Sequence, residues 1–310
     1  MNKIFIVIPT YFDGESIVEI VDEIHEIFKS NFSIFSPHFI LVDDSCGKDT
    51  ALANLPLKIP NVENLNIMKS KSNLGNQGAI ILGLDFVIRQ LNSGDFVLVL
   101  DGDGEDDPKD INILIDTIKN DSTLDIVLAE RGKRASDFKF KFSLFIFKIM
   151  FYILTGKKWK AGNFSILKGD WLLEYYDLIC TYNSFAGSIQ SLRANRIYRI
   201  IDRKPRRYGS SQTSNQGKIL HALNSLTPWV ETIQIRSLLF FGFMFLNFLI
   251  SIAAVSILKF VYHSAAPNWF TLVIFSTISL SLIALNIFLT SQMLISIINL
   301  TKKINPNFNK

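Results

Sequence analysis

Residues 96–108 read FVLVLDGDGEDDP, a short apolar run that ends in five carboxylates within seven residues. Residues 96–100 have the composition of a buried strand. Carboxylates placed at its end repel one another unless a cation neutralises them. A hard divalent ion with oxygen ligands does so, and Mg²⁺ or Mn²⁺ commonly takes substrate phosphates as well. We therefore predict a metal site formed by Asp101, Asp103 and Glu105.

The same stretch has a second interpretation, as a solvated acidic turn before a helix. Asp107 would then cap the helix and Pro108 would occupy its first position. An EF-hand loop fits poorly, because Asn112 stands where the twelfth loop position needs a glutamate.

Outward from this stretch, strand and helix patterns alternate through residues 1–135. Apolar strands are expected at residues 4–8, 39–42, 96–100 and 126–128, and helices at residues 16–28, 78–91 and 111–118. Continuous Val, Ile and Leu runs separated by helices predict an α/β fold with a Rossmann-like, mostly parallel sheet. In such sheets ligands bind beyond the carboxyl ends of the strands.

Two other segments carry residues suited to a nucleotide. Asp43 and Asp44 can accept hydrogen bonds from ribose hydroxyls or a base, although Asp49 or Thr50 nearby can equally cap a helix. The segment with Asn73, Gly75 and Gly78 offers backbone N–H groups at a helix start, suited to a diphosphate. A plain helix-start loop is the alternative for that segment.

Composition excludes several classes of protein. The 310 residues are 48% hydrophobic and 19% charged, which excludes disorder as the main state. Cys46 and Cys180 are the only cysteines, so neither a disulfide scaffold nor a structural zinc site is expected. The first residues lack the features of a signal peptide, and we expect the N-terminal part to stay in the cytosol.

Charge is unevenly distributed along the chain. Residues 1–137 hold 23 acidic and 12 basic residues, whereas the remainder holds 5 and 20. Basic charge beside apolar segments suits an anionic membrane surface. No nucleic-acid motif accompanies it, and we expect no nucleic-acid partner.

Two long apolar segments near the C-terminus predict membrane spans. The 42 residues between Lys259 and Lys302 contain no Asp, Glu, Lys or Arg. Residues 238–260 and 270–300 are each long enough for one span, a buried hairpin being the alternative. Arg236 before the first span and the lysines after the second place both termini and the N-terminal α/β domain on the cytoplasmic side of the inner membrane. Packing of these helices against a second copy would give a homo-oligomer.

Residues 143–154 are apolar, flanked by lysines and too short to span, which predicts a helix lying in the headgroup plane. Core packing with extended lysines is the alternative. A second such helix is expected over residues 215–235, leading into the first span. The predicted organisation is a nucleotide-binding core at 1–137, a membrane-interface region at 138–236, a two-helix transmembrane hairpin at 237–301 and a cytoplasmic tail at 302–310.

Four motifs, IVIPTYFDGES, LVDDS, NLGNQGA and DGDGEDDP, occur in an order and spacing that resemble glycosyltransferase family 2, which has the GT-A fold. With the apolar C-terminal segments, the chain resembles the polyprenyl-phosphate glycosyltransferases of that family. The resemblance implies a membrane-bound, metal-dependent, inverting hexosyltransferase for cell-envelope glycans. The donor would be a UDP- or GDP-linked sugar, bound by the nucleotide-sugar-binding core at 1–137. The acceptor would be a polyprenyl phosphate, on the acceptor side formed by residues 138–236.

The resemblance also implies roles for single residues. Nucleotide-sugar contacts fall on Pro9, Tyr11, Asp13, Asp43, Asp44, Asn73, Gly75, Gly78 and Asp101. Metal binding falls on Asp101, Asp103 and Glu105, and catalysis on Asp103, Asp106 and Asp107. Binding of the acceptor phosphate falls on Arg131, Arg134, Arg206 and Arg207, for which lipid-headgroup contact or a solvated basic face is the alternative.

The chain departs from the family pattern at several positions, among them Lys48, which replaces an acid, Asn163, where many relatives have Asp, and Gln212, where a lysine is usual. Ala194 follows Arg193 where processive polysaccharide synthases have a tryptophan, so the signature of those enzymes is absent. These departures concern the acceptor more than the donor.

Two further functions stay open from the sequence. One is the addition of a single sugar to another lipid-linked or cell-surface glycan, which needs a base such as Asp106 or Asp107. The other is an inactive nucleotide-binding membrane subunit.

Overall fold

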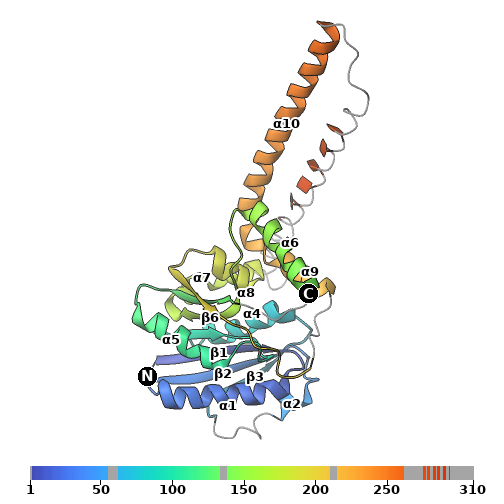
Figure 1. Cartoon of the computed structure of the whole chain (residues 1–310). Helices are drawn as coiled ribbons and strands as arrows, with labels where there is room; N and C mark the ends of the chain where they lie inside the picture. The colour runs from blue at the N-terminus through green and yellow to red at the C-terminus, as the bar shows by residue number, and fades with distance from the viewer. Residues whose placement is uncertain are drawn as a thin grey trace, which may run out of the picture. The chain divides into compact units, whose positions relative to one another are not determined.

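The computed structural model describes residues 2–54, 62–132, 138–209 and 215–261, with single positions between 275 and 293. Seven strands form one sheet in the order β3-β2-β1-β4-β6-β5-β7 (Figure 1). The strands are β1 (Asn2–Thr10), β2 (Phe35–Asp43), β3 (Leu65–Lys69), β4 (Phe96–Val99), β5 (Ile126–Arg131), β6 (Ala161–Lys168) and β7 (Arg196–Ile201).

The sheet is mostly parallel, which confirms the α/β prediction. Strand β1 pairs in parallel with β2 and β4, β2 with β3, and β5 with β7. Only β6 runs antiparallel to its neighbours β4 and β5 among the described strands. Parallel pairing brings the carboxyl ends of β1, β2 and β4 to one edge.

Helices connect the strands as the crossovers of a parallel sheet require. They are α1 (Gly14–Asn31), α2 (Thr50–Ala53), α4 (Gly75–Ile88), η1 (Pro108–Asp110), α5 (Ile111–Asn120), α6 (Phe138–Thr155), α7 (Gly169–Tyr182), α8 (Phe185–Ser191), α9 (Asn215–Asn224), η2 (Thr227–Trp229) and α10 (Val230–Phe260).

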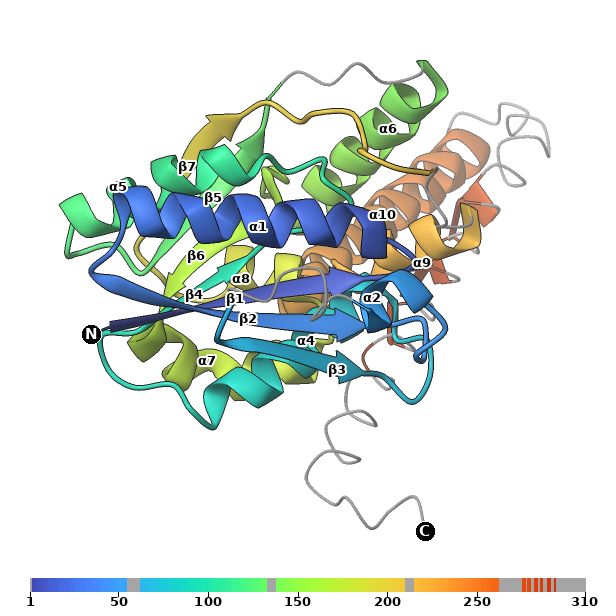
Figure 2. The same cartoon turned by 90° about the horizontal axis from the view of Figure 1, so that it is seen from below.

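The sheet is covered on both faces, because side chains of successive strand residues point to opposite sides. Ile4, Ile6 and Ile8 of β1 pack with helices α1 and α5. Phe5 and Val7 pack on the other side with α4, α7 and α8. Figure 2 shows α1 and α5 on one face and α4 and α7 on the other. Both faces are therefore buried, as the continuous apolar strands predict.

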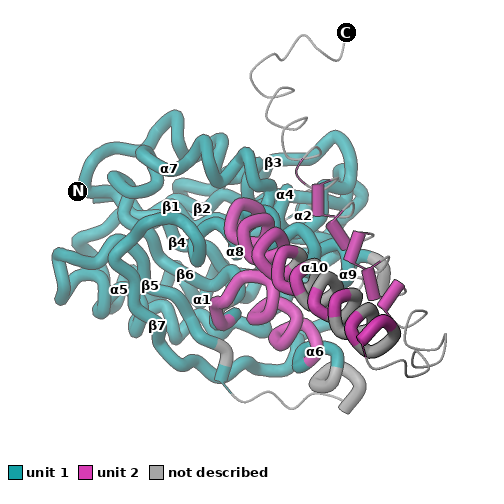
Figure 3. The backbone as a smooth tube through the Cα atoms, turned by 90° about the horizontal axis from the view of Figure 1, so that it is seen from above, with its two compact units in different colours: residues 1–145, 159–228 teal, residues 146–158, 229–310 magenta. Residues whose placement is uncertain are grey.

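Strands β6 and β7 come from the segment that the sequence pattern assigns to the membrane-interface region. The chain divides into two compact units, coloured separately in Figure 3. The first comprises residues 1–145 and 159–228, and the second comprises residues 146–158 and 229–310. The α/β sheet is therefore completed by residues beyond the predicted core boundary at 137.

The predicted apolar helix at residues 143–154 lies within α6. It carries exposed apolar side chains on Phe145, Ile146, Ile149 and Ile153, which contradicts full core packing for these four. The expectation of one helix through residues 215–235 is wrong: the helix breaks into α9 and α10 around Pro228, whose nitrogen carries no hydrogen to donate.

Within the described parts of the chain, no helix is both long enough and apolar enough to cross a membrane. Most of the second predicted span, residues 270–300, lies outside the described residues. Both spans stay predictions from the sequence.

Gly83 gives a test of how closely α4 packs on the sheet. A Cβ at Gly83 would lie 2.6 Å from Val7 Cγ1 and 3.0 Å from Val42 Cγ2. Gly-to-Ala changes inside helices usually stabilise by about 0.5–1 kcal/mol. Here overpacking reverses the sign, and we expect Gly83→Ala to destabilise by about 1–3 kcal/mol. The thermal unfolding midpoint of the full chain in detergent measures this.

Gly242→Ala in α10 is the matched control, because nothing lies within 4 Å of its added Cβ. An unchanged or raised midpoint for Gly83→Ala would contradict the close approach of α4 to β1 and β2.

Candidate functional site

The loops after β1, β2 and β4 meet at the carboxyl edge of the sheet. The Asp44 amide donates to the Thr10 carbonyl at 2.9 Å, which joins the ends of β2 and β1. Pro9 is buried near the end of β1, and the half-buried Tyr11 packs edge-on against Phe12 with 4.8 Å between ring centroids. The structure thus brings the predicted residues of three separate motifs to one edge.

Asp43 stabilises the turn that follows its own strand. Its Oδ1 accepts from the Ser45 amide at 2.9 Å and the Ser45 hydroxyl at 2.6 Å, and its Oδ2 accepts from the Gly47 amide at 3.0 Å. Three donors therefore already satisfy this buried carboxylate. A contact between Asp43 and a base or ribose stays a prediction.

Asp44 fastens the start of α4 to the end of β2. Its Oδ1 accepts from the Leu74 amide at 2.7 Å and its Oδ2 from the Gly75 amide at 2.8 Å. The Asn73 side chain also accepts from the Gly75 amide, at 3.0 Å. Two amides that the sequence offers to a diphosphate are thus bonded to a carboxylate of the same chain. This geometry favours the helix-start interpretation for Asn73 and Gly75, and for Gly78 one turn further.

Asp49 caps two helices at once. Its Oδ1 accepts from the Ala51 and Leu52 amides at 3.1 and 3.2 Å, and its Oδ2 accepts from the Gly14 amide at 3.0 Å. Capping by Asp49, one of the two alternatives from the sequence, is confirmed. The N-termini of α1 and α2 are held together beside Asp13.

The acidic loop 101–107 closes around a side chain that the sequence motifs do not include. Arg203, two residues beyond β7, donates to Asp101 Oδ2 at 2.8 Å, Glu105 Oε2 at 2.7 Å and Asp106 Oδ1 at 3.0 Å. Its side chain is 9% exposed. The cation that the clustered acids require is present within the chain.

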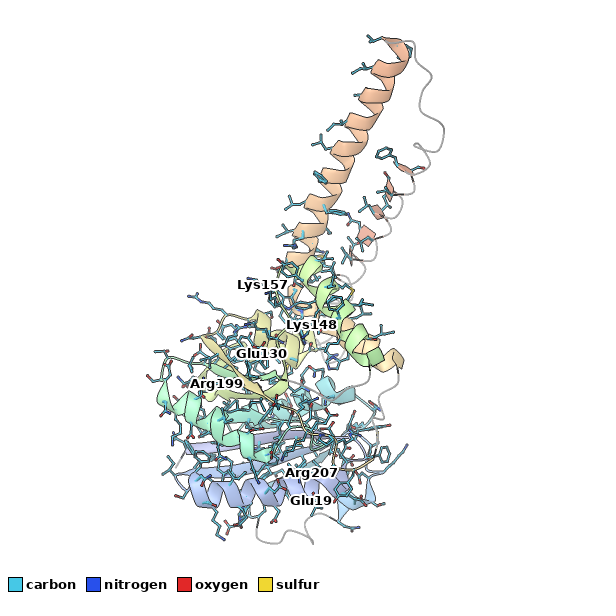
Figure 4. The ribbon with its side chains drawn as sticks, in the orientation of Figure 1. Glu19, Glu130, Lys148, Lys157, Arg199 and Arg207 are labelled. Atoms are coloured by element: carbon cyan, nitrogen blue, oxygen red, sulfur yellow. The ribbon has the colours of Figure 1, made fainter. Side chains whose placement is uncertain are left out.

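The residues after Arg203 continue this pairing. Lys204 Nζ lies 2.5 Å from Asp107 Oδ2, and Arg206 lies 3.4 Å from both Asp13 Oδ1 and Asp103 Oδ2. Arg207 contacts Glu19 at 3.0 Å and Glu23 at 2.8 Å on α1. Figure 4 shows Arg207 beside Glu19. We call residues 203–207 the basic segment.

The signal for the basic segment was present in the sequence as Arg203-Lys-Pro-Arg-Arg207, four cations in five residues. Of these four cations, the family pattern includes Arg206 and Arg207. Arg131 ends β5, whereas Arg134, Ser210 and Gln212 lie outside the described residues. The structure places Arg206 and Arg207 at the acidic edge, where both pair with carboxylates.

Burial and charge shift the protonation of this cluster. Burial raises the pKa of Asp106 to about 6, against the attraction of Arg203. Burial also raises the pKa of Asp13 to about 6, which Arg206 opposes and Asp103 reinforces. Burial alone would lower the pKa of Arg203, but the charges of Asp106 and Asp101 outweigh it and raise that pKa. Arg203 is therefore charged at any ordinary pH.

Asp107 behaves as the helix-cap alternative predicts. Its Oδ1 accepts from the Lys109 amide at 3.2 Å, and Pro108 begins the helical turn η1. Burial opposes its ionisation, but the hydrogen bonds from Lys204 and Lys109 lower its pKa overall. Asp107 thus accepts from the Lys109 amide through one oxygen and pairs with the Lys204 ammonium through the other.

The side-chain amide of Asn163, on β6, is held by three hydrogen bonds that suit an amide at this position. Its Nδ2 donates to Asp101 Oδ1 at 2.9 Å and to Asn76 Oδ1 at 2.8 Å. Its Oδ1 accepts from Gln77 Nε2 at 2.8 Å. Each atom of the amide has the partner that its chemistry needs, and a carboxylate here would face Asp101 without a donor.

The acidic loop fits a hard divalent cation by its chemistry. Asp101, Asp103 and Glu105 supply oxygen ligands of the kind that Mg²⁺ and Mn²⁺ prefer. Among the described residues, the four cations of the basic segment pair with eight different carboxylates. Carboxylates therefore outnumber cations in these ion pairs. In the same part of the chain, however, no three His, Cys, Asp or Glu side chains are already arranged to hold a metal. Three of the carboxylates converge on Arg203 instead.

A cavity of about 280 Å³ opens next to Asp13 and Arg206. Polar and aromatic groups line it, among them Phe12, Glu15, Lys48, Asp49 and Tyr208. Phe12 has a backbone φ of 58°, a strained value for a bulky residue, and its ring is exposed at 49%. The cavity lies at the same carboxyl edge as the acidic loop.

A mostly parallel α/β sheet with a charged cavity at its carboxyl edge is typical of nucleotide-binding α/β proteins. Residues 5–174, more than half of the chain, match the model of glycosyl transferase family 2. The chain belongs to this family.

Solved structures agree on the fold. Glucosyl-3-phosphoglycerate synthase from Mycobacterium tuberculosis, in complex with Mn²⁺, UDP-glucose and phosphoglyceric acid, is 11% identical with a TM-score of 0.52, over 75% of this chain and 80% of that chain. The same enzyme with Mn²⁺, UDP and glucosyl-3-phosphoglycerate is 10% identical with a TM-score of 0.50, over 74% and 80%. No curated protein matches the chain. At these identities the similarity is one of fold.

The amide at position 163 can be tested by Asn163→Asp. A carboxylate there would face Asp101 at about the 2.9 Å that now separates donor and acceptor, and like charges raise one another's pKa. We expect a loss of about 1–3 kcal/mol in stability at pH 7. The loss should shrink at pH 5, where a shared proton restores the hydrogen bond. Thermal unfolding at both pH values measures it.

Asn120→Asp, at an exposed position at the end of α5, is the matched control and should change little at either pH. An equal loss for Asn163→Asp at pH 5 and pH 7 would contradict the charge argument.

The raised pKa of Asp13 predicts a pH-dependent stability. The folded state holds a proton up to about pH 6, whereas the ordinary value is 3.8. Asp13 therefore stabilises fully below pH 4, and this contribution is lost as the pH rises through 6. The difference corresponds to at most about 3 kcal/mol, and partial exposure reduces it to on the order of 1 kcal/mol.

Comparison with Asp13→Asn isolates this contribution. We expect the wild-type stability relative to Asp13→Asn to fall between pH 4 and pH 7, measured by denaturant unfolding. A difference that is constant with pH, or that rises, would contradict the shift.

Proposed function

We propose that this protein is a membrane-bound, inverting glycosyltransferase that moves a sugar from a nucleotide-diphosphate sugar to a polyprenyl phosphate. The observation that carries the proposal is the carboxyl edge of a family 2 core, where acidic loop 101–107 and the basic segment lie together. An acidic loop suits a metal and its phosphates, and neighbouring arginines suit a second anion.

The donor half of the proposal rests on the acidic loop. Asp101, Asp103 and Glu105 would hold Mg²⁺ or Mn²⁺, and glucosyl-3-phosphoglycerate synthase, which shares the fold, is found with Mn²⁺ and UDP-glucose. Such an ion neutralises charge on the nucleotide diphosphate as it leaves.

The acceptor half rests on cations beside that loop. A phosphate acceptor is already an anion at pH 7, so it needs positioning more than it needs a base. Arg206 and Arg207 offer guanidinium groups that bind phosphate through two hydrogen bonds. Arg131 and Arg134 belong to the same proposal from the family pattern. Attack on C1 opposite the leaving diphosphate inverts the anomeric configuration.

The state of the remaining carboxylates favours a phosphate over a sugar hydroxyl as acceptor. A hydroxyl needs a general base, for which Asp106 and Asp107 are the candidates. Asp106 Oδ1 pairs with Arg203 and its Oδ2 accepts from the Asp101 amide at 3.2 Å. Asp107 is bonded to Lys204 and Lys109. Both candidates are thus engaged while the basic segment is in place, and each keeps one oxygen on a backbone amide without that segment. Asn163 cannot act as a base.

The location is proposed from the sequence. The uncharged stretches at 238–260 and 270–300 are long enough for two spans of the inner membrane, with both termini and the catalytic core in the cytosol. The exposed apolar side chains of α6, among them Ile149 and Ile153, suit contact with membrane lipids.

Replacing Asp103 tests the metal role. Asp103 Oδ2 lies 3.4 Å from Arg206, a long pairing that suits an oxygen that also serves a metal. We expect Asp103→Asn to lose about 10²-fold or more in transfer from the nucleotide sugar, because charge on the leaving group is no longer neutralised. Transfer is measured with radiolabelled donor in detergent with added Mn²⁺.

Asp116→Asn, the same change on the exposed side of α5, should keep the wild-type rate. Full activity of Asp103→Asn would refute the metal role. The same transfer assay, run separately with a short polyprenyl phosphate, a glycolipid or 3-phosphoglycerate as acceptor, identifies the acceptor. Nucleotide binding without transfer in every arm would favour the inactive subunit.

A further inference from the structure

Arg203 occupies the position among the acids where a divalent ion would be expected. Its three guanidinium nitrogens contact Asp101, Glu105 and Asp106 at 2.7–3.0 Å, and the first two are carboxylates of the proposed metal site. A planar cation with several donors can satisfy several carboxylates at once. The site is therefore neutralised in part without any metal.

The oxygens that Arg203 binds are those that a metal would need. Asp101 Oδ1 accepts from both Asn76 and Asn163, at 3.2 and 2.9 Å, so Arg203 holds the other oxygen of this carboxylate. Glu105 likewise directs Oε2 at Arg203. A divalent ion that bridged Asp101 Oδ2 and Glu105 Oε2 would compete with the guanidinium, which already bridges the same two oxygens.

The basic segment is attached to the acidic loop along its length. The Lys204 amide donates to the Glu105 carbonyl at 3.0 Å, and the Arg207 amide donates to the Asp103 carbonyl at 3.2 Å. Gly104, with φ +78°, lies directly beneath Arg207, where an added Cβ would meet Arg207 Cγ at 2.4 Å. The segment itself has no helix or strand between residues 202 and 209, so it can separate from the loop without breaking a regular element.

Building on the proposed function, we infer that Arg203 is an internal counterion that competes with the divalent metal for Asp101 and Glu105. In the metal-free enzyme Arg203 holds the acidic loop in a folded, partly neutral state. When the basic segment is released, Asp101 and Glu105 become available to the metal. Arg206 and Arg207 then leave their carboxylate partners and bind substrate phosphates instead. Binding of metal and release of the segment are then one coupled event.

If Arg203 competes with the metal, removing Arg203 should raise the affinity for the metal. Removing a cation that merely supports the fold would instead leave that affinity unchanged or lower it. We expect Arg203→Gln to bind Mn²⁺ in the absence of donor at least about tenfold more tightly than wild type. Mn²⁺ titration followed by electron paramagnetic resonance, on the full chain in detergent, measures this.

Arg89→Gln is the matched control, because Arg89 pairs with Asp85 on an exposed turn of α4 and its replacement makes the same change in net charge. Its Mn²⁺ affinity should equal that of wild type. Equal or weaker Mn²⁺ binding by a folded Arg203→Gln overturns the inference.

A measurement on the wild type covers the case in which Arg203→Gln does not fold. Hydrogen exchange of peptides spanning residues 203–207 should speed up when Mn²⁺ is added without donor, because the Lys204 and Arg207 amides lose their acceptors. Unchanged or slower exchange, in a protein that binds Mn²⁺ and transfers sugar, overturns the inference and leaves the proposed function intact. A wild type that binds no Mn²⁺, with or without donor, contradicts both.

Discussion

Negative charge gathered at the carboxyl edge of a parallel sheet is the constraint on which the rest of this site depends. Strand β4 is buried, and it delivers Asp101 and Asp106 to a place where water cannot fully solvate them. Unpaired carboxylates in such a place are costly, and they either take up protons or acquire cations. Both responses are visible, since burial raises the pKa of Asp106 to about 6 and Arg203 supplies a buried positive charge.

The acids of this edge divide into two groups by their donors. Asp43, Asp44 and Asp49 accept from backbone amides of the turns and helix starts around them. They fix the loops and are already satisfied. Asp101 instead faces side-chain donors and a cation, and Asp103 turns Oδ2 to Arg206 while its Oδ1 accepts from the Glu105 amide at 3.0 Å. The side-chain partners can be exchanged for a ligand without unfolding a turn. The second group is therefore the chemically available one.

Much of the first half of the fold was predictable from the sequence, because strands buried on both faces read as continuous apolar runs. Strands β1, β2, β4 and β5 were expected, although β5 extends to Arg131. Strand β3 was missed because it is a short, half-buried strand at the edge of the sheet. Strands β6 and β7 were missed, since they lie between apolar helices and β7 carries Arg196 and Arg199. Their positions are set by pairing with strands far away in the chain, which no local pattern contains.

The candidate site was predictable in its residue types and not in its pairings. Clustered acids need a cation, and the sequence led us to expect a metal ion in that role. Arg203 lies 102 residues from Asp101, and only the pairing of β7 beside β5 brings the two together.

The pairing of Arg203, Lys204, Arg206 and Arg207 also changes the meaning of the charge asymmetry along the chain. The basic excess beyond residue 137 suggests contact with anionic lipid, yet these four of its twenty cations face carboxylates of the first half. Part of that excess is therefore an internal counterion for the acidic edge. The case for a membrane then rests on the uncharged stretches at 238–260 and 270–300 and on the apolar surface of α6, because the pairing of charges explains none of these apolar features.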